Sequence, residues 1–182
     1  MATGVVTLAC GRGRRSWWHA CLVVLLVLVG GCGSPPPAHN AADVLFLQQA
    51  ITHHGQGVAL ADLAASRPVS APVRDLAAAI AATQRSEITQ MTAWLAAWGE
   101  PIVHSSHTDG HHGVVPAMEL VDAADGEFER KLLTVLTGHQ HGAVELAQVE
   151  LVEGVNEGAK RLADRVVRSR AEQISQMLTL AG

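Results

Sequence analysis

The amino-acid sequence predicts an all-α protein, a four-helix bundle made of two repeated helix pairs and preceded by a lipoprotein signal peptide. Three observations lead to this prediction. From residue 41 onward, apolar residues recur every three to four positions, which is the period of an amphipathic helix. The whole pattern is repeated 86 residues further along the chain. A short apolar run that ends at a cysteine stands before both copies.

Residues 1–31 have the features of a signal peptide. Three arginines and no acidic residue precede an apolar run from Ala20 to Gly31. At roughly 1.5 Å per helical residue, this run is too short to cross a hydrocarbon core of roughly 30 Å. It ends in Val29-Gly30-Gly31-Cys32, which resembles a bacterial lipobox, so we expect cleavage before Cys32 and attachment of a palmitate-type lipid to it. An uncleaved amino-terminal anchor helix is the alternative.

The mature chain is expected to be exported and held by this lipid on the extracytoplasmic face of the cell membrane. Residues 32–40 contain three consecutive prolines and are predicted to form a stiff, lipidated tether. Residues 32–182 carry 10 Lys and Arg against 17 Asp and Glu, which gives a formal charge of −7. An acidic domain without a basic cluster is a poor nucleic-acid binder, so no nucleic-acid partner is expected.

Residues 41–182 form the expected bundle. Asp43 is predicted to open the first helix as a cap or first-turn acid, and Pro68 and Pro72 separate the first helix from the second. Repeat one covers residues 43–98, a His-rich linker covers 102–116, and repeat two covers 126–180. The later helices are expected over Val73–Trp98, Glu127–Glu153 and Gly158–Leu180, with residues 150–157 as the last turn.

The repeat aligns the two halves of the bundle without a gap. His53 then matches His139, and Met91 matches Met177. Most of the other identities are apolar and lie at helical spacing, so the repeated property is a buried face. One helix pair cannot bury such a face alone, whereas two pairs packed together share a core.

Segments of both repeats resemble a family called domain of unknown function 305. In the first repeat they are Asp43-Val-Leu-Phe46, Ile51-Thr-His53-His54-Gly-Gln-Gly57, and Leu76 to Trp94 with Gln84, Glu87 and Met91. In the second they are Gly126 to Glu129, His139-Gln-His141-Gly142-Ala143 and Ile174-Ser-Gln176-Met177. The resemblance covers residues 43–180. It implies an exported bacterial bundle of the ferritin-like type that handles a metal, usually copper, through the His and Met residues of this doubled motif.

Methionines that the family usually places near these histidines are replaced in this chain. Those positions hold Ala50, Leu60, Leu136 and Leu146. Thioether ligands favour Cu(I), and only three methionines follow the expected cleavage site. We therefore expect binding through histidine, with copper as the first choice of metal ion and zinc as the second.

The first candidate site lies inside the bundle. His53 and Glu87 interrupt apolar stripes, and a buried histidine or carboxylate is costly unless it is paired or bound to a metal. Together with Met91 and His139 they are predicted to form a half-buried metal site between helices. The alternative is a structural hydrogen bond between His53 and Glu87 that fixes helix register. His54 is a further candidate ligand, but it points about 100° away from His53, so the two cannot bind one ion without help from other helices and His54 is expected to face solvent.

Further candidate ligands come from the second repeat and from the linker. His141 and Met177 complete the set taken from the doubled motif. A flexible linker can bring several imidazoles to one ion, and it contains His104, His107, His111 and His112. The alternative for this linker is a solvated polar connection. Both sites need neutral imidazoles, so we expect binding to weaken as the pH falls through about 6.5.

These observations favour a non-enzymatic metal-binding lipoprotein that sequesters a transition metal or passes it on. A structural or partner-binding helical module of the cell envelope is the alternative. No Ser-His-Asp order, cysteine nucleophile or phosphate loop is visible, and the Glu-x-x-His pattern of di-iron bundles is missing. The sequence points to no particular protein partner and is compatible with an oligomer. The last helix carries Arg161, Arg165, Arg168 and Arg170, which are expected to form a solvated face.

Overall fold

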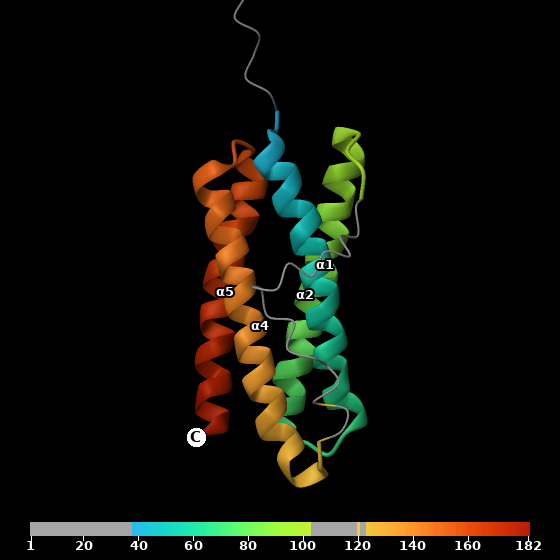
Figure 1. Ribbon diagram of the computed structural model, residues 1–182, viewed down its shortest axis with the longest axis vertical. Helices are drawn as coiled ribbons and strands as arrows, with labels where there is room; N and C mark the ends of the chain where they lie inside the picture. Colours follow the sequence, from blue (N-terminus) through green and yellow to red (C-terminus); the bar gives the residue numbers. More distant parts are fainter. Residues whose placement is uncertain (1–37, 103–119, 121–122) are drawn as a thin grey trace, which may run out of the picture. The chain divides into compact units, whose positions relative to one another are not determined.

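The computed structural model describes residues 38–102, 120 and 123–182, and it confirms the all-α fold (Figure 1). The described residues contain no strand and form four long helices, α1 (Ala41–Ser66), α2 (Ala71–Trp98), α4 (Asp125–Glu153) and α5 (Glu157–Ala181). Asp43 lies in the first turn of α1, as one of the two predicted roles requires, and α2, α4 and α5 begin one or two residues earlier than the sequence predicts. Helix α4 ends at Glu153 as predicted, and the turn before α5 covers only residues 154–156 of the expected 150–157. No described helix is both long and apolar enough to span a membrane.

Several predicted features lie outside the described residues. They are the signal peptide, the lipidation site Cys32, the tether up to residue 37, and the linker histidines His104, His107, His111 and His112. The last residues of the tether are described and are bonded to the turn between α4 and α5. Asn156 Nδ2 donates to the Ala38 carbonyl at 2.6 Å, and Asn40 Nδ2 donates to the Glu153 carbonyl at 2.8 Å.

The helices form two antiparallel pairs, α1 with α2 and α4 with α5, each joined by a short turn (Figure 1). The pairs meet mainly through α1 and α4, whereas α2 and α5 make a sparser contact. The start of α1 lies at the α4–α5 turn, so α1 and α4 are antiparallel and α2 runs parallel to α4. The end of α2 and the start of α4 therefore lie at opposite ends of the bundle. Such a single crossover is the connection found in ferritin-like bundles.

The apolar core consists of two clusters, one toward each end of the bundle. The first contains Phe46, Leu47 and Met91, and the second contains Leu132, Leu133 and Met177, among other buried residues. The members named for the second cluster are the repeat counterparts of those named for the first. Each cluster draws on helices of both repeats, as the shared-core argument predicts.

The ends of the bundle show the same duplication. Asp43, near the start of α1, accepts a hydrogen bond of 2.9 Å from the backbone N–H of Asn156 in the α4–α5 turn. Its counterpart Glu129, near the start of α4, accepts hydrogen bonds from the backbone N–H and the hydroxyl of Ser70 in the α1–α2 turn. Ser70 is in turn the repeat counterpart of Asn156. Each repeat therefore holds the turn of the other with a carboxylate.

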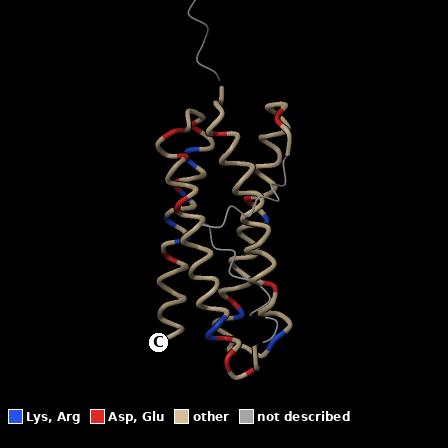
Figure 2. Tube along the Cα trace, in the orientation of Figure 1, with Lys and Arg blue, Asp and Glu red and all other residues tan. Residues whose placement is uncertain are grey.

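The end with the α4–α5 turn also buries a pair of acids, and acidic residues gather there (Figure 2). Glu150 is fully buried beside Asp43, and a Cβ at Gly154 would lie closer than 3.0 Å to its carboxyl oxygen. Burial, assisted by the contact with Asp43, raises the pKa of Glu150 to about 8. Burial also acts to raise the pKa of Asp43, but hydrogen bonds from the Asn156 and Asn40 backbone outweigh it and lower that pKa. Glu150 therefore carries a proton at neutral pH, and Asp43 is ionised.

We expect this proton to make stability depend on pH. A carboxyl whose pKa is higher in the folded state contributes stability that is fully present below its unfolded pKa of 4.5 and is lost as the pH rises through about 8. In Glu150→Gln an amide N–H replaces the proton, so the free energy of unfolding should fall less between these pH values than in the wild type. Urea denaturation at a series of pH values measures the difference.

Glu153→Gln is the matched control, because it makes the same chemical change at an exposed position at the end of the same helix. It should leave the pH dependence of the wild type unchanged. Parallel pH profiles for the wild type and Glu150→Gln would show that no proton is held between the two acids.

Candidate functional site

A layer of polar side chains separates the two apolar clusters halfway along the bundle. We call it the polar layer; its members are His53 and His54 of α1, Gln84 and Glu87 of α2, His139 and Gln140 of α4, and Arg170 and Gln173 of α5. Six of them are at most 5% exposed, and Glu87 and Gln173 are partly buried. Every helix contributes two residues, so the layer touches all four helices at once.

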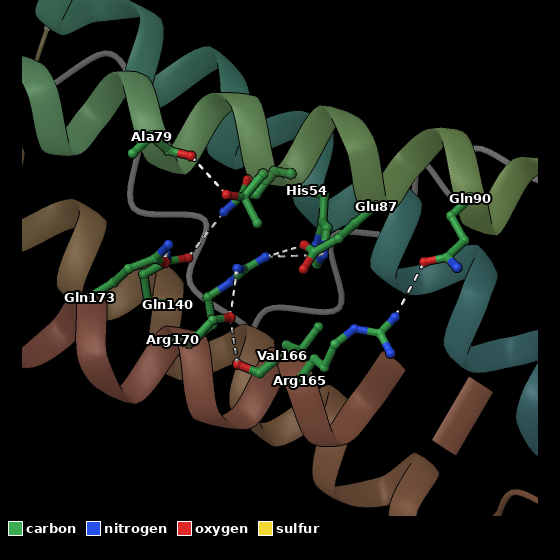
Figure 3. Close-up of polar contacts among 12 residues, drawn as sticks. His54, Ala79, Glu87, Gln90, Gln140, Arg165, Val166, Arg170 and Gln173 are labelled. Carbon is green, nitrogen blue, oxygen red and sulfur yellow. Dashed lines mark hydrogen bonds and ion pairs between the residues drawn. The ribbon is translucent and has the colours of Figure 1, made fainter. Parts of the chain in front are cut away.

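One half of the polar layer is charged (Figure 3). Arg170 Nη2 donates a hydrogen bond to Glu87 Oε2. His54 Nε2 lies 2.9 Å from the same oxygen and 3.4 Å from Arg170 Nη2. The three side chains thus form a compact cluster, which we call the charged half. It joins α2 to α5, the two neighbouring helices that otherwise make the sparsest contact.

The other half of the polar layer is neutral and consists of three amides. Gln140 Nε2 donates to Gln173 Oε1, and Gln84 Nε2 donates to Gln140 Oε1 at 3.1 Å. We call this group the neutral half. The repeat relates the halves residue by residue: Gln140 corresponds to His54, Gln173 to Glu87, and Gln84 to Arg170. The same three-membered network is therefore built twice, once with charges and once without.

His53 and His139 lie where the two repeats meet. Their rings are stacked with centroids 3.9 Å apart and an angle of 18° between the ring planes. Two glycines make room for them. A Cβ at Gly57 would lie closer than 3.0 Å to His139 Nε2, and a Cβ at Gly142 would lie 3.0 Å from His53 Nε2. His53 and His139 are repeat counterparts, so the pair of rings has the twofold character of the whole bundle.

His54 and His139 are neutral at neutral pH. Burial, with additional effects from the charges of His54 and Arg170, lowers the pKa of His139 to about 4. Burial also lowers the pKa of His54, by more than the neighbouring Glu87 raises it. Burial alone would raise the pKa of Glu87, but the His54 hydrogen bond and the Arg170 charge outweigh it and lower that pKa. Neutral imidazole is the form that binds metal ions.

The structure brings some of the predicted site residues together and separates others. His53 meets His139, as the site prediction requires, but Glu87 contacts His54 and Arg170. The expectation that His54 faces solvent is wrong, because this residue is only 1% exposed. Since α1 packs against both α2 and α4, two side chains about 100° apart can each face a different helix.

The remaining predicted ligands of the bundle lie away from the polar layer. Met91 and Met177 are fully buried in the two separate apolar clusters, and Met177 Sδ accepts a hydrogen bond of 3.8 Å from Thr137. His141 is exposed, whereas His139 is buried. In the described part of the chain, no group of three or more His, Cys, Asp or Glu side chains is placed to hold a metal ion.

Arg170 contradicts the expected solvated face of arginines on the last helix. It is fully buried, whereas Arg161 and Arg168 are exposed and pair with acids one turn earlier on α5. Sequence reasoning missed Arg170 although a signal was present. The residue corresponds to Gln84 in the first repeat, and Glu87 corresponds to a glutamine in the second, so the repeats differ by one positive and one negative charge. Two compensating changes of this kind indicate a pair in contact.

The duplicated helix pairs and the buried polar layer define a four-helix bundle built from two repeats. Comparison with known proteins identifies its family. The sequence model of domain of unknown function 305 (DUF305) matches residues 43–181, so the chain belongs to the DUF305 family. This confirms the resemblance found in the doubled His motif. No curated protein sequence matches the chain.

Solved structures of similar fold agree with this assignment. A DUF305 fragment from Deinococcus radiodurans is 28% identical, with a TM-score of 0.74, over 80% of this chain and 99% of that one. A DUF305 protein from Streptomyces coelicolor, regarded as secreted, is 30% identical, with a TM-score of 0.69, over 76% of this chain and 89% of that one. CopM in its Cu(II)-bound form is 23% identical, with a TM-score of 0.69, over 76% of this chain and 95% of that one.

The packing around Gly57 leads to a stability prediction. In Gly57→Ala the new methyl group would collide with Gln84 and His139, so the polar layer must shift. We expect a loss of about 1–3 kcal/mol in the free energy of unfolding, the usual cost of overpacking a well-packed core. Chemical denaturation followed by circular dichroism measures it.

Gly55→Ala is the matched control, because Gly55 is exposed on the same helix and a Cβ there has nothing within 4 Å. Alanine is the better helix former, so this variant should be equally stable or more stable by up to about 1 kcal/mol. Equal stabilities of the two variants would contradict the close packing at the polar layer.

Proposed function

We propose that this protein binds a transition metal ion outside the cytoplasm, with copper as the first candidate, and that His53 and His139 hold the ion. The observation that carries the proposal is the buried pair of stacked imidazoles at the junction of the repeats. Among the described residues, the His139 ring has only a contact with the His53 backbone, and neither of its nitrogens has a hydrogen bond of ordinary geometry. A buried polar group without such a partner is costly, and coordination to a metal would satisfy it.

The donors of this pair fit the proposed ion in type. Imidazole nitrogen binds copper and zinc well, and the low pKa of His139 keeps its ring in the neutral, ligating form. Two protein ligands fall short of the four that a structural zinc site uses, so a zinc ion here would need further ligands. The absence of a side chain at Gly57 and Gly142 allows the two rings to pack closely against the helix backbone.

CopM supports the proposal only through its fold. Structures of CopM contain Cu(II), Cu(I) or silver, and their sequence identity to this chain is 22–23%. At this level the likeness concerns the architecture, so copper in CopM does not assign copper to this protein. The support that belongs to this chain is the pair of His53 and His139 at equivalent positions of the two repeats.

The place of action is part of the same proposal. The signal-peptide features of residues 1–31 and the lipobox-like residues before Cys32 support export and a lipid anchor. A relative from Streptomyces coelicolor regarded as secreted is in line with export. The anchored protein would sequester the metal or pass it on without catalysing a reaction.

A structural or partner-binding module of the cell envelope is the second candidate. The polar layer favours it in one respect, because its neutral and charged halves already satisfy most of their own hydrogen-bonding groups. On this second interpretation, the only role of the network is to fix the register of the four helices. This candidate predicts a protein whose melting temperature is unaffected by copper or zinc.

Calorimetric titration with Cu(I), Cu(II) and Zn(II) tests the proposal. We expect micromolar or tighter copper binding by the wild type and loss of that binding in His53→Gln/His139→Gln. Because the pKa of His139 is about 4, binding in the bundle should persist well below pH 6.5 and weaken only as the pH approaches 4. Binding through unperturbed histidines, as expected from the sequence, would instead weaken near pH 6.5.

The control is the variant in which the four linker histidines are changed to alanine, His104, His107, His111 and His112. It should keep the acid-resistant binding and lose only binding that disappears near pH 6.5, the usual pKa of an unperturbed histidine. Absence of micromolar uptake by the wild type, together with melting temperatures that are equal with and without metal, would overturn the proposal and favour the structural module.

A further inference from the structure

Arg170 is a charged side chain with no exposed surface, and its surroundings are unusual for an arginine. Its guanidinium donates to Glu87 Oε2, lies 3.4 Å from His54 Nε2, and donates to the hydroxyl of Ser169 at 3.1 Å. The residue is fully buried. A charge in such a place is costly unless an opposite charge compensates it, so its presence needs a reason.

The repeat shows what this position holds in the other half of the polar layer. There the counterpart of Arg170 is Gln84, and all three members of the network are uncharged amides that bond to one another. The fold therefore accepts a neutral network at this level of the bundle. The charged half is an alternative to that network, and the packing of four helices does not by itself require it.

The charged half without its arginine has the composition of a cation site. A carboxylate oxygen of Glu87 and the Nε2 atom of His54 lie 2.9 Å apart and face the same guanidinium nitrogen. Carboxylate oxygen and imidazole nitrogen are common ligands of divalent transition metals. The cationic Nη2 atom of Arg170 thus occupies the position that a metal ion bound to both groups would take.

We propose that Arg170 is a built-in replacement for a bound cation. Its guanidinium compensates Glu87, occupies the place between Glu87 and His54, and closes the charged half of the polar layer to metal ions. Metal taken up by the bundle is thereby directed to the pair of His53 and His139. Only this last consequence rests on the proposed function, because the closed cation site is a property of the charged half alone.

The experiment compares Arg170→Gln with the double variant Glu87→Gln/Arg170→Gln. Arg170→Gln introduces the amide that the first repeat has at the equivalent position, Gln84. It leaves the Glu87 carboxylate beside His54 without its cation. We expect this variant to bind one more equivalent of Zn(II) or Cu(II) than the wild type, and to melt at a higher temperature with the metal than without it. Calorimetry and thermal denaturation followed by circular dichroism provide the two readouts.

The double variant is the matched control, because it copies the glutamines of the neutral half and removes the carboxylate. It should fold and gain no equivalent. His54→Gln/Arg170→Gln should likewise lose most of the gain, since it deletes the nitrogen ligand. An equal gain in the double variant, or no gain in a folded Arg170→Gln protein, would overturn the proposal.

Misfolding of the single variant is also informative. If Arg170→Gln is unfolded without metal, recovery of its helical circular dichroism on addition of Zn(II) supports the proposal, and absence of recovery while the double variant folds overturns it. The result is separable from that for the proposed function. A wild type that binds no metal would defeat the role of His53 and His139, yet the gain in Arg170→Gln would remain measurable.

Discussion

The contact between Arg170 and Glu87 holds two opposite charges away from water in the middle of a small helical bundle. Removing one partner of such a buried pair usually costs about 3–5 kcal/mol, because the other charge is left without compensation. The pair also connects α2 with α5, the neighbouring helices that touch least elsewhere. Its geometry can be satisfied only when both helices are in the correct axial register, so the charged half restricts the sliding that apolar clusters alone would permit.

Duplication explains most of the remaining structure. The two apolar clusters, the carboxylates that hold the turns and the hydrogen-bond pattern of the polar layer each occur twice. Two positions at which the copies differ hold buried ionisable side chains in one copy only. Glu150, which carries a proton beside Asp43, corresponds to Ala64 in the first repeat, and Arg170 corresponds to Gln84. Selection on a duplicated bundle can change such positions in one copy while the other copy maintains the fold.

The fold could be predicted from the sequence because it depends on periodic burial. Apolar spacing located four helices, and the alignment of the halves required a shared core. The site could be predicted only in part. The stripes indicated that His53, Glu87 and His139 are buried, but the period of a single helix does not say which neighbouring helix a buried side chain faces. For this reason the sequence alone places His54 in solvent and pairs Glu87 with the wrong histidine, whereas the compensating charges of Arg170 and Glu87 indicate their contact.

Anomalous diffraction from crystals of the wild-type protein grown with copper tests the central claim most directly, namely that the charged half of the polar layer is closed and the histidine pair is open. The account predicts an anomalous copper peak within bonding distance, about 2 Å, of a ring nitrogen of His53 and of His139, with the Arg170–Glu87 contact intact. A copper peak between Glu87 and His54 with Arg170 displaced, or no copper anywhere inside the bundle, would contradict it.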